Sequence, residues 1–223
     1  MSTFHDPAMV ARYHEGPPRF VPGFADMQRM ARVLLAERAP GDARVLVLGA
    51  GGGLELKVFA DGQPEWRFDG VDPSRAMLDL ARQTVAPHAG RVRLHEGYID
   101  MAPAGPFDAA SCLLTMHFMP PTERLHALRA FHARLAPGSP FVVVHMSIVR
   151  GPSGRKRWMA RDEAFAVAGG VAPEMARQRR DGIAAGLQVL APDEDEALLR
   201  EAGFLDIEVF YVGGAFRGWV CHA

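Results

Sequence analysis

A run of four apolar residues that leads directly into a glycine-rich loop is the feature that most constrains the fold of this chain. Val45–Leu48 is typical of a short strand buried on both faces. Four of the next five residues, Gly49–Gly53, are glycines, and a helical pattern begins at Leu54. Glycine lets a backbone approach a ligand closely because it has no Cβ, and a helix N-terminus offers unpaired N–H groups. We therefore expect a ligand-binding strand–loop–helix unit here.

An acidic residue ends the next predicted strand. The short run Arg67–Val71 is followed at once by Asp72, whose carboxylate could accept both hydroxyls of a ribose. The glycine loop and this acid together predict a nucleoside site. A dinucleotide fingerprint would need its last glycine at Leu54 or Leu56, so the spacing does not match one. An ordinary strand–helix turn without a ligand is the alternative that the loop alone leaves open.

The middle of the chain alternates between strand-like and helix-like segments. Ser74 is a plausible helix N-cap, and Pro137-Gly138 stops a helix. Such alternation favours an α/β fold, in which a parallel sheet is covered by helices on both faces. The predicted strands are 43–48, 66–71, 91–95, 108–114 and 140–147; the predicted helices are 7–13, 24–38, 54–60, 74–85 and 121–135.

The last third of the chain breaks this alternation. Two helical stretches, near 160–168 and 173–185, lie in a basic segment, and an acidic helix start follows at Asp193–Glu196. Acidic residues suit the first turn of a helix because of its dipole. Two strands, near 205–212 and 215–221, close the chain. The arginines and lysine of the basic segment are Arg150, Arg155, Lys156, Arg157, Arg161, Arg177, Arg179 and Arg180.

The composition limits the class of partner. The 223 residues are 48% hydrophobic and carry a net charge of -1, which supports one substantial core but no general attraction to nucleic acid or membranes. Cys112 and Cys221 fall in apolar runs, and we expect buried thiols, as suits a reducing cytoplasm. No metal-ligand spacing, signal peptide or membrane-length apolar run is recognised. We expect a cytoplasmic protein without a metal, a membrane partner or direct nucleic-acid contact; a homodimer is left open.

Three motifs follow one another along the chain: Gly49-x-Gly51-x-Gly53, Gly70-Val71-Asp72-Pro73-Ser74-Arg75-Ala76-Met77-Leu78 and Phe107-Asp108-Ala109-Ala110-Ser111-Cys112-Leu113-Leu114. In this order they resemble the motifs of class I S-adenosylmethionine (SAM) methyltransferases. The resemblance implies a Rossmann-like fold with a mostly parallel seven-stranded sheet, helices on both faces and an antiparallel last strand. It also implies SAM as cofactor and S-adenosylhomocysteine (SAH) as product.

The same resemblance implies one domain and a set of cofactor contacts. We expect an N-terminal helical cap at 1–40, a SAM-binding core at 41–149, a basic helical lid at 150–192, and a C-terminal helix with a closing hairpin at 193–223. The glycine loop would line the methionine part of SAM, and Asp72 would hold the ribose. The expected contacts are Phe24, Gly49, Ala50, Gly51, Gly53, Asp72, Pro73, Met77, Tyr98, Ile99 and Leu113.

Three further segments are Arg19-Phe20-Val21-Pro22-Gly23-Phe24, Thr115-Met116-His117-Phe118-Met119-Pro120-Pro121-Thr122-Glu123-Arg124 and Gln178-Arg179-Arg180. They resemble segments of carboxy-SAM synthase, a subfamily that makes a carboxylated SAM for tRNA wobble-uridine modification. In that family the arginine matching Arg180 binds the added carboxylate. Three polar cofactor contacts of the family are replaced here by Phe24, Tyr98 and Leu113.

Few catalytic groups are needed for methyl transfer, because the sulfonium is already an activated leaving group and the enzyme mainly positions the reactants and excludes water. A base is needed only if the nucleophile must lose a proton. His117 and His145 are predicted at strand ends; His117 is our candidate base, and Arg180 our candidate for holding an acidic group near the methyl. The alternatives are a histidine that bonds the backbone and an arginine that points to solvent.

These patterns rank three functions. The first is a SAM-dependent methyltransferase that acts on a small anionic acceptor, with the basic segment 150–180 as a lid that recognises the anion. The second is carboxy-SAM synthase chemistry. The third is a SAM-binding regulator or partner subunit without catalysis.

Overall fold

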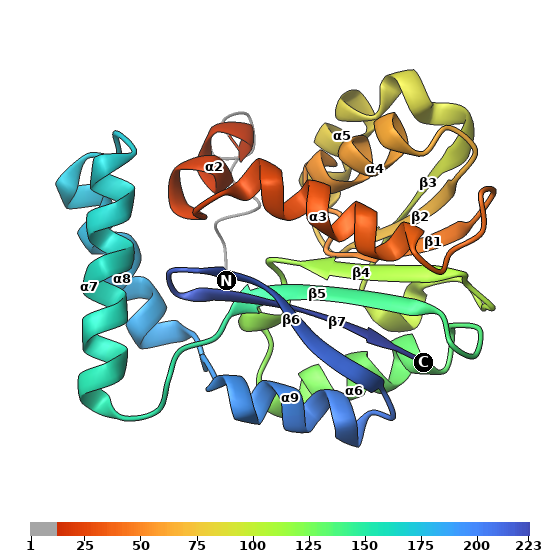
Figure 1. The fold of residues 1–223 in the computed structure, drawn as a ribbon. Coiled ribbons are helices and arrows are strands. Elements are labelled where there is room, and N and C mark those ends of the chain that lie inside the picture. Colours follow the sequence, from red (N-terminus) through yellow and green to blue (C-terminus); the bar gives the residue numbers. More distant parts are fainter. Residues whose placement is uncertain (1–12) are drawn as a thin grey trace.

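A single seven-stranded sheet forms the centre of the molecule, in the order β3-β2-β1-β4-β5-β7-β6. The computed structural model describes residues 13–223. Five strands run parallel, β7 runs antiparallel to β5, and β6 pairs antiparallel with β7 at the edge (Figure 1). This confirms the predicted sheet and its antiparallel closing hairpin. The strands are β1 Arg44–Leu48, β2 Arg67–Asp72, β3 Val92–Glu96, β4 Ala109–Leu113, β5 Pro140–Met146, β6 Leu205–Gly213 and β7 Phe216–His222.

Helices cover both faces of this sheet. On one face lie α3 (Phe24–Ala36), α4 (Leu54–Gly62) and α5 (Arg75–Thr84). On the other lie α6 (Pro121–His132) and α9 (Pro192–Glu201), as Figure 1 shows.

The alternation of side chains along β1 explains why its sequence is apolar throughout. Val45 and Val47 belong to the buried cluster on the α3–α4 side, whereas Leu46 and Leu48 belong to the cluster on the α6–α9 side. Successive residues of a strand point to opposite faces, so a strand covered on both sides needs apolar residues at every position.

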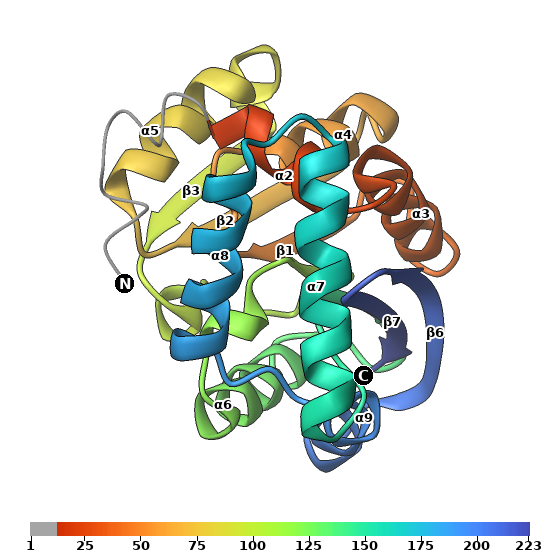
Figure 2. The same cartoon turned by 90° about the vertical axis from the view of Figure 1, so that its left-hand side faces the viewer.

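Three helices gather at the carboxyl ends of the parallel strands. They are α2 (Gly16–Phe20), α7 (Pro152–Ala168) and α8 (Pro173–Gly186). Figure 2 looks onto this edge and shows α7 and α8 side by side in front of the strands. Open α/β sheets bind their ligands at the carboxyl ends of the strands, so the α7–α8 hairpin stands where a lid would stand.

Most predicted boundaries agree with the structure to within a few residues. The main difference is α7, which starts at Pro152 rather than near 160, because proline is compatible with the first turn of a helix. α6 ends at His132, before the predicted 135, and the following residues form a turn. The helix predicted at 7–13 falls almost entirely outside the described residues. Four short 3-10 turns, η2 Tyr13–Glu15, η3 Ala86–Arg91, η4 Ile99–Met101 and η5 Met116–Phe118, complete the described elements.

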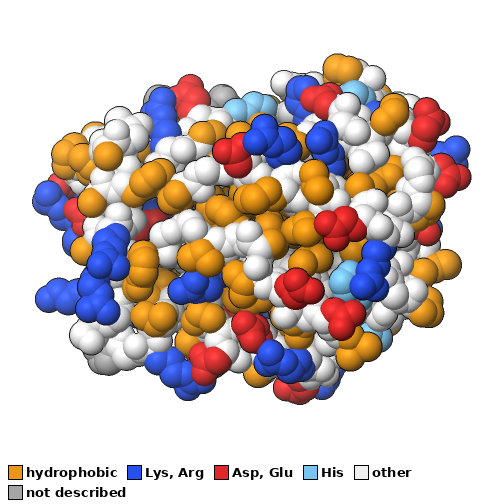
Figure 3. Space-filling model, viewed as in Figure 1, with side chains coloured by type: hydrophobic (Ala, Val, Ile, Leu, Met, Phe, Trp, Pro, Cys, Tyr) orange, Lys and Arg blue, Asp and Glu red, His pale blue; other side chains and the backbone are white. Residues whose placement is uncertain are grey.

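The surface bears a mixture of charges. Figure 3 shows acidic and basic side chains interspersed with apolar ones on the face that presents α3 and β6. Among residues 13–223, no helix has the length and apolar character needed to cross a membrane. Cys112 and Cys221 are both buried free thiols, as predicted.

Candidate functional site

The glycine loop is held against the end of β2 by its own backbone. The N–H groups of Gly49 and Ala50 donate to the carbonyl of Val71 at 2.8 and 3.0 Å. Gly49 has φ +76°, and a Cβ built there would lie 1.9 Å from Thr115 Oγ1. Gly53, with φ +82°, packs against the backbone of Ala81 in the same way. Glycine is therefore required here both for the backbone conformation and for the close approach of neighbouring chain.

Asp72 ties the glycine loop to the start of α5. Its Oδ2 accepts from the N–H of Gly51 and its Oδ1 from the N–H of Ser74, each at 2.9 Å. The Ser74 hydroxyl in turn accepts from the N–H of Met77 at 3.3 Å and caps α5, as predicted. A carboxylate oxygen can accept more than one hydrogen bond, so these two bonds alone do not exhaust the acceptors of Asp72.

Tyr13 and His14 lie directly on the glycine loop. A Cβ built on Gly51 would lie 3.1 Å from Tyr13 Oη, and one built on Gly52 would lie 2.8 Å from Tyr13 Cδ1. His14 Nε2 lies 3.2 Å from the Gly52 carbonyl, which also accepts from Thr84 Oγ1 at 2.6 Å. Burial, followed by the negative charges of Asp72 and Glu55, raises the pKa of Tyr13 to about 12. Tyr13 is thus a neutral phenol that covers the loop.

A buried acid that the sequence analysis missed lies beneath the loop. Glu55, in the first turn of α4, is 5% exposed and accepts a hydrogen bond from Ser111 Oγ on β4. Burial raises the pKa of this carboxyl to about 8, although the Ser111 bond works in the opposite direction. The spacing in the sequence could have indicated this burial. Glu55 stands four residues before the core residue Phe59, so both side chains lie on the same face of α4.

The other predicted cofactor contacts are distributed unevenly. Met77 Cε would lie 3.6 Å from a Cβ on Gly51, so Met77 borders the loop. Phe24, Ala50 and Leu113 are buried in one apolar cluster on the α3–α4 side. Ile99 is buried in the opposite cluster, Tyr98 is 67% exposed, and Pro73 is exposed. The structure therefore groups the glycine loop with Asp72 and Met77, while Tyr98, Ile99 and Pro73 lie around β2 and β3.

His117 and His145 are both buried behind the strand ends. His117 Nδ1 accepts from the N–H of Met146 at 3.4 Å. Burial, assisted by the neighbouring His145 and by the guanidinium groups of Arg124 and Arg179, holds the pKa of His117 well below its usual range. Its neutral form then carries the proton on Nε2, so the nitrogen that could act as a base is occupied. His145 Nε2 lies 3.0 Å from Asp195 Oδ1.

A buried ion pair holds the segment between α8 and α9 in place. Arg124, 1% exposed, donates to Asp195 Oδ1 at 3.2 Å, to the Met119 carbonyl at 3.0 Å and to the Gln188 carbonyl at 2.5 Å. These partners belong to the loop before α6, to the chain between α8 and α9, and to α9 itself. One guanidinium therefore anchors the chain after α8 to α6 and α9.

Most basic side chains of the 150–180 segment contact carboxylate or carbonyl oxygens. Arg180 pairs with Glu163 at 2.6 Å and with Asp181 at 2.8 Å. Arg179 pairs with the buried Asp162, and Arg155 donates to the Leu187 carbonyl at 3.0 Å. The remaining pairs are Arg150 with Asp193 and Glu194, and Arg177 with Glu174. Within residues 13–223, Lys156 and Arg157 are exposed and lack an ion pair.

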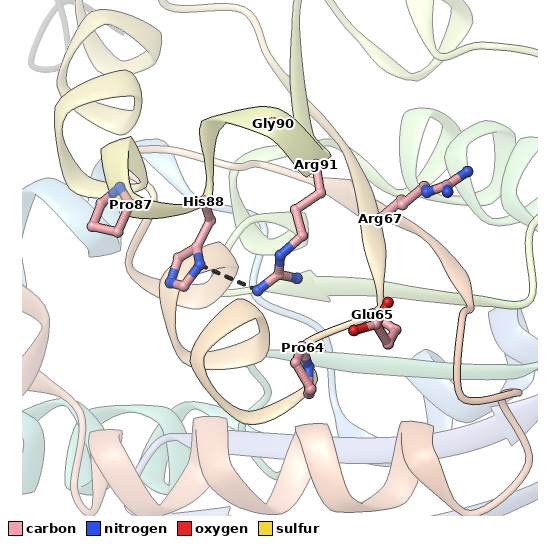
Figure 4. Close-up of a pocket in the computed structure, with 7 residues that line it drawn as sticks. All are labelled: Pro64, Glu65, Arg67, Pro87, His88, Gly90 and Arg91. Carbon is pink, nitrogen blue, oxygen red and sulfur yellow. Dashed lines mark hydrogen bonds between the residues drawn. The ribbon is translucent and has the colours of Figure 1, made fainter.

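A hollow elsewhere on the molecule is structural. The residues in Figure 4 surround the amino ends of β2 and β3, away from the carboxyl ends where the glycine loop lies. Arg91 contacts His88 there at 3.1 Å and donates to the carbonyls of Ala60, Gln63 and Trp66. Its guanidinium is used to cap the end of α4 and the start of β2.

Comparisons with known proteins agree with this geometry. Residues 45–138 match the family model described as "Methyltransferase domain". The chain is 22% identical to the carboxy-S-adenosyl-L-methionine synthase of Campylobacter curvus, over 95% of this chain and 90% of the relative. It is 33% identical to the trans-aconitate 2-methyltransferase of Streptomyces avermitilis, over 60% of this chain and 47% of the relative.

Solved structures share the fold at low identity. An O-methyltransferase family protein from Burkholderia thailandensis aligns with a TM-score of 0.73 and 15% identity, covering 100% of this chain and 63% of that chain. Human N-acetylserotonin methyltransferase, solved with SAM, aligns with a TM-score of 0.63 and 14% identity. The alignment covers 99% of this chain and 57% of that chain. This chain thus spans about three fifths of the length of these two neighbours.

The residues at the carboxyl ends of β1 and β2 fit SAM as the cofactor. The loop of Gly49, Gly51 and Gly53 packs against Thr115, Tyr13 and Ala81 with no room for side chains of its own, and the Asp72 carboxylate is joined to it by the hydrogen bond from the Gly51 N–H. Met77 borders the loop with an apolar surface. The chain therefore has the fold of these methyltransferases, and its residues 45–138 match the methyltransferase-domain family.

Proposed function

We propose that this protein transfers the methyl group of SAM to a small acceptor that carries a carboxylate or phosphate. The observation that carries the proposal is the hydrogen bond between Asp72 and Gly51, which joins the ribose-binding acid to the glycine loop in one rigid unit. Arginines at the carboxyl ends of the strands favour an anionic acceptor.

The residues of this chain would act by positioning and by excluding water. SAM supplies a methyl group on an activated sulfonium, so little acid–base chemistry is required of the protein. Asp72 and the glycine loop would orient the cofactor, and Tyr13 with α2 would cover it from the N-terminal side. The α7–α8 hairpin would close the acceptor side. A base role for His117 is not favoured, because its unprotonated nitrogen accepts from Met146.

Calorimetry and product analysis test this proposal together. SAM and SAH should each bind the protein at one site, and SAH should accumulate when SAM and a suitable small carboxylic acid are both present. A panel of di- and tricarboxylates that includes trans-aconitate provides the first acceptors, because one relative is a trans-aconitate 2-methyltransferase. Absence of SAM and SAH binding would refute the proposal. Binding without turnover on any acceptor would favour a SAM-binding regulator or partner subunit.

Carboxy-SAM synthase chemistry is the second candidate, and one observation favours it. The similarity to the Campylobacter curvus enzyme extends over nearly the whole of both chains. Two observations count against it. Phe24, Tyr98 and Leu113 stand where the carboxy-SAM synthase family has polar residues that contact the cofactor. Arg180, which matches the carboxylate-binding arginine of that family, is paired with Glu163 and Asp181. The two functions differ in the cofactor that the purified protein should carry: SAM or SAH for the first, and a cofactor heavier by one CO₂ for the second. Mass spectrometry of the released cofactor distinguishes them.

A further inference from the structure

Two adjacent arginines of α8 have different surroundings. Arg180 is 33% exposed and pairs with Glu163 and the neighbouring Asp181, both at the edge of the α7–α8 hairpin. Arg179 pairs instead with Asp162, whose side chain is only 3% exposed, and its guanidinium stacks 4.5 Å from the centre of the Phe20 ring. Successive helix residues are about 100° apart around the axis, so the two side chains leave α8 in different directions.

The side chain of Arg179 points towards α2, where it meets Phe20. Phe20 is the last residue of α2, whose preceding turn contains Tyr13, the residue that lies on the glycine loop. Phe20 also packs on the small apolar cluster formed by Ala166, Val171 and Ala176 of the hairpin. The positive charge of Arg179 further reaches His117, after β4, and lowers its pKa. Arg179 thus lies between α7 and α2, where it contacts Asp162 and the Phe20 ring.

The hydrogen-bonding capacity of Arg179 is only partly used. In residues 13–223, Asp162 is the one acceptor bound to its guanidinium, through Nη1, which leaves Nε and Nη2 without an acceptor. A guanidinium presents its donors as a planar fork that matches a carboxylate or phosphate with two parallel hydrogen bonds. Asp162 itself is poorly solvated: burial raises its pKa, and Arg179 opposes that effect.

We propose that Arg179 is the acceptor-binding arginine of the lid, and that Asp162 is an internal carboxylate that occupies part of its guanidinium until an anionic acceptor arrives. This inference rests on the proposed function and names the residue that selects an anionic substrate. The acceptor's carboxylate or phosphate takes the free edge of the fork, while Phe20 supports the guanidinium from its face. Arg180 instead holds α7 and α8 together through Glu163.

The test measures binding of a probe anion to the SAH complex by calorimetry, with trans-aconitate as the carboxylate probe and inorganic phosphate as the second. Arg179→Ala should weaken binding of trans-aconitate by at least about tenfold, since a hydrogen-bonded charge pair is lost. The affinity of Arg179→Lys for trans-aconitate should lie between those of the wild type and Arg179→Ala, because a lysine keeps the charge but loses the planar pair of donors. Arg177→Ala, on the same helix and exposed, is the matched control and should bind the probe as the wild type does.

Asp162→Asn separates a binding role from a structural one. If Asp162 competes with the acceptor for Arg179, the amide should strengthen probe binding by roughly threefold or more, because the internal negative charge is removed. If the pair serves only to hold the hairpin, the same variant should lower the melting temperature and leave the affinity unchanged, and that result would overturn the inference. Asp162→Asn and Arg179→Lys also keep the test decisive if Arg179→Ala does not fold.

Two other outcomes count against Arg179. Loss of probe binding in Arg180→Ala with retention in Arg179→Ala would assign the anion to the other arginine. A wild-type SAH complex that binds neither trans-aconitate nor phosphate would overturn the anion site while SAM binding still stands. Failure of SAH itself to bind would instead refute the proposed function, so the two failures are distinguishable.

Discussion

The carboxylate of Asp72 accepts a hydrogen bond at 2.9 Å from the N–H of Gly51, a residue 21 positions earlier in the chain. This bond joins the end of β2 to the turn after β1, two strands that pair in parallel. It makes the acid both a candidate cofactor ligand and a structural support of the glycine loop.

Asp72→Ala should therefore lower SAM affinity by on the order of a hundredfold, because about 2–3 kcal/mol of charge-assisted hydrogen bonding is removed. The measurement is calorimetric titration with SAM and SAH. Asp79→Ala provides the control, since Asp79 is an exposed acid of α5 that pairs with the surface residues Arg75 and Arg82. A folded Asp72→Ala protein with wild-type SAM affinity would show that the cofactor lies elsewhere.

Gly49→Ala should destabilise the loop strongly. The added Cβ would lie 1.9 Å from Thr115 Oγ1, and the residue would keep φ near +76°, which costs a non-glycine residue roughly 1–2 kcal/mol even without a clash. Gly41→Ala is the matched control, because a Cβ there meets nothing within 4 Å. Thermal unfolding should show a much lower melting temperature for Gly49→Ala and little change for Gly41→Ala. Equal melting temperatures would mean that the loop adapts more readily than its packing suggests.

Glu55→Gln should change how stability depends on pH. The folded pKa of Glu55, about 8, lies above its ordinary value of 4.5, so the folded state binds more protons than the unfolded state between these values. The stability of the wild type should then fall as pH rises from 4.5 to 8, by on the order of a few kcal/mol, since each pKa unit corresponds to about 1.4 kcal/mol.

The glutamine variant lacks this titration, so the difference in unfolding free energy between wild type and Glu55→Gln isolates it from other groups. Denaturant unfolding at several pH values measures that difference. Glu123→Gln, an exposed acid of α6, should show a pH profile parallel to the wild type. A pH-independent difference between wild type and Glu55→Gln would mean that Glu55 is ionised in the folded protein at neutral pH.

Arg124→Met should cost about 3–5 kcal/mol of stability, because it removes the guanidinium partner of the buried Asp195, leaving His145 as its neighbour, and frees two carbonyl groups. Arg129→Ala, five residues later on the same helix, removes an exposed pair with Glu201 and should cost less than about 1 kcal/mol. Urea denaturation of both variants makes the comparison. Similar losses in the two would indicate that the buried pair contributes no more than a surface pair.

Much of this architecture follows from local sequence patterns. The apolar run Val45–Leu48, the glycines after it and the acid at Asp72 predict a strand, a loop and a strand end, and each lies where expected. These features depend on period and on backbone freedom, which are properties of neighbouring residues. The alternation of strands and helices then predicts a parallel sheet because few other arrangements bury such a pattern.

Contacts between distant segments could not be obtained in this way. Glu55 meets Ser111 across 56 positions, Tyr13 reaches the glycine loop, and His117 is buried against Met146. Arg179 and Arg180 are adjacent and chemically identical in the sequence, yet one faces Phe20 and the other Glu163. The sequence by itself determined the elements and the position of the glycine loop; tertiary structure decided which charged groups are buried and which face the site. The reason is physical: burial and pairing depend on how α2, α7 and α8 pack together, and no local period specifies that packing.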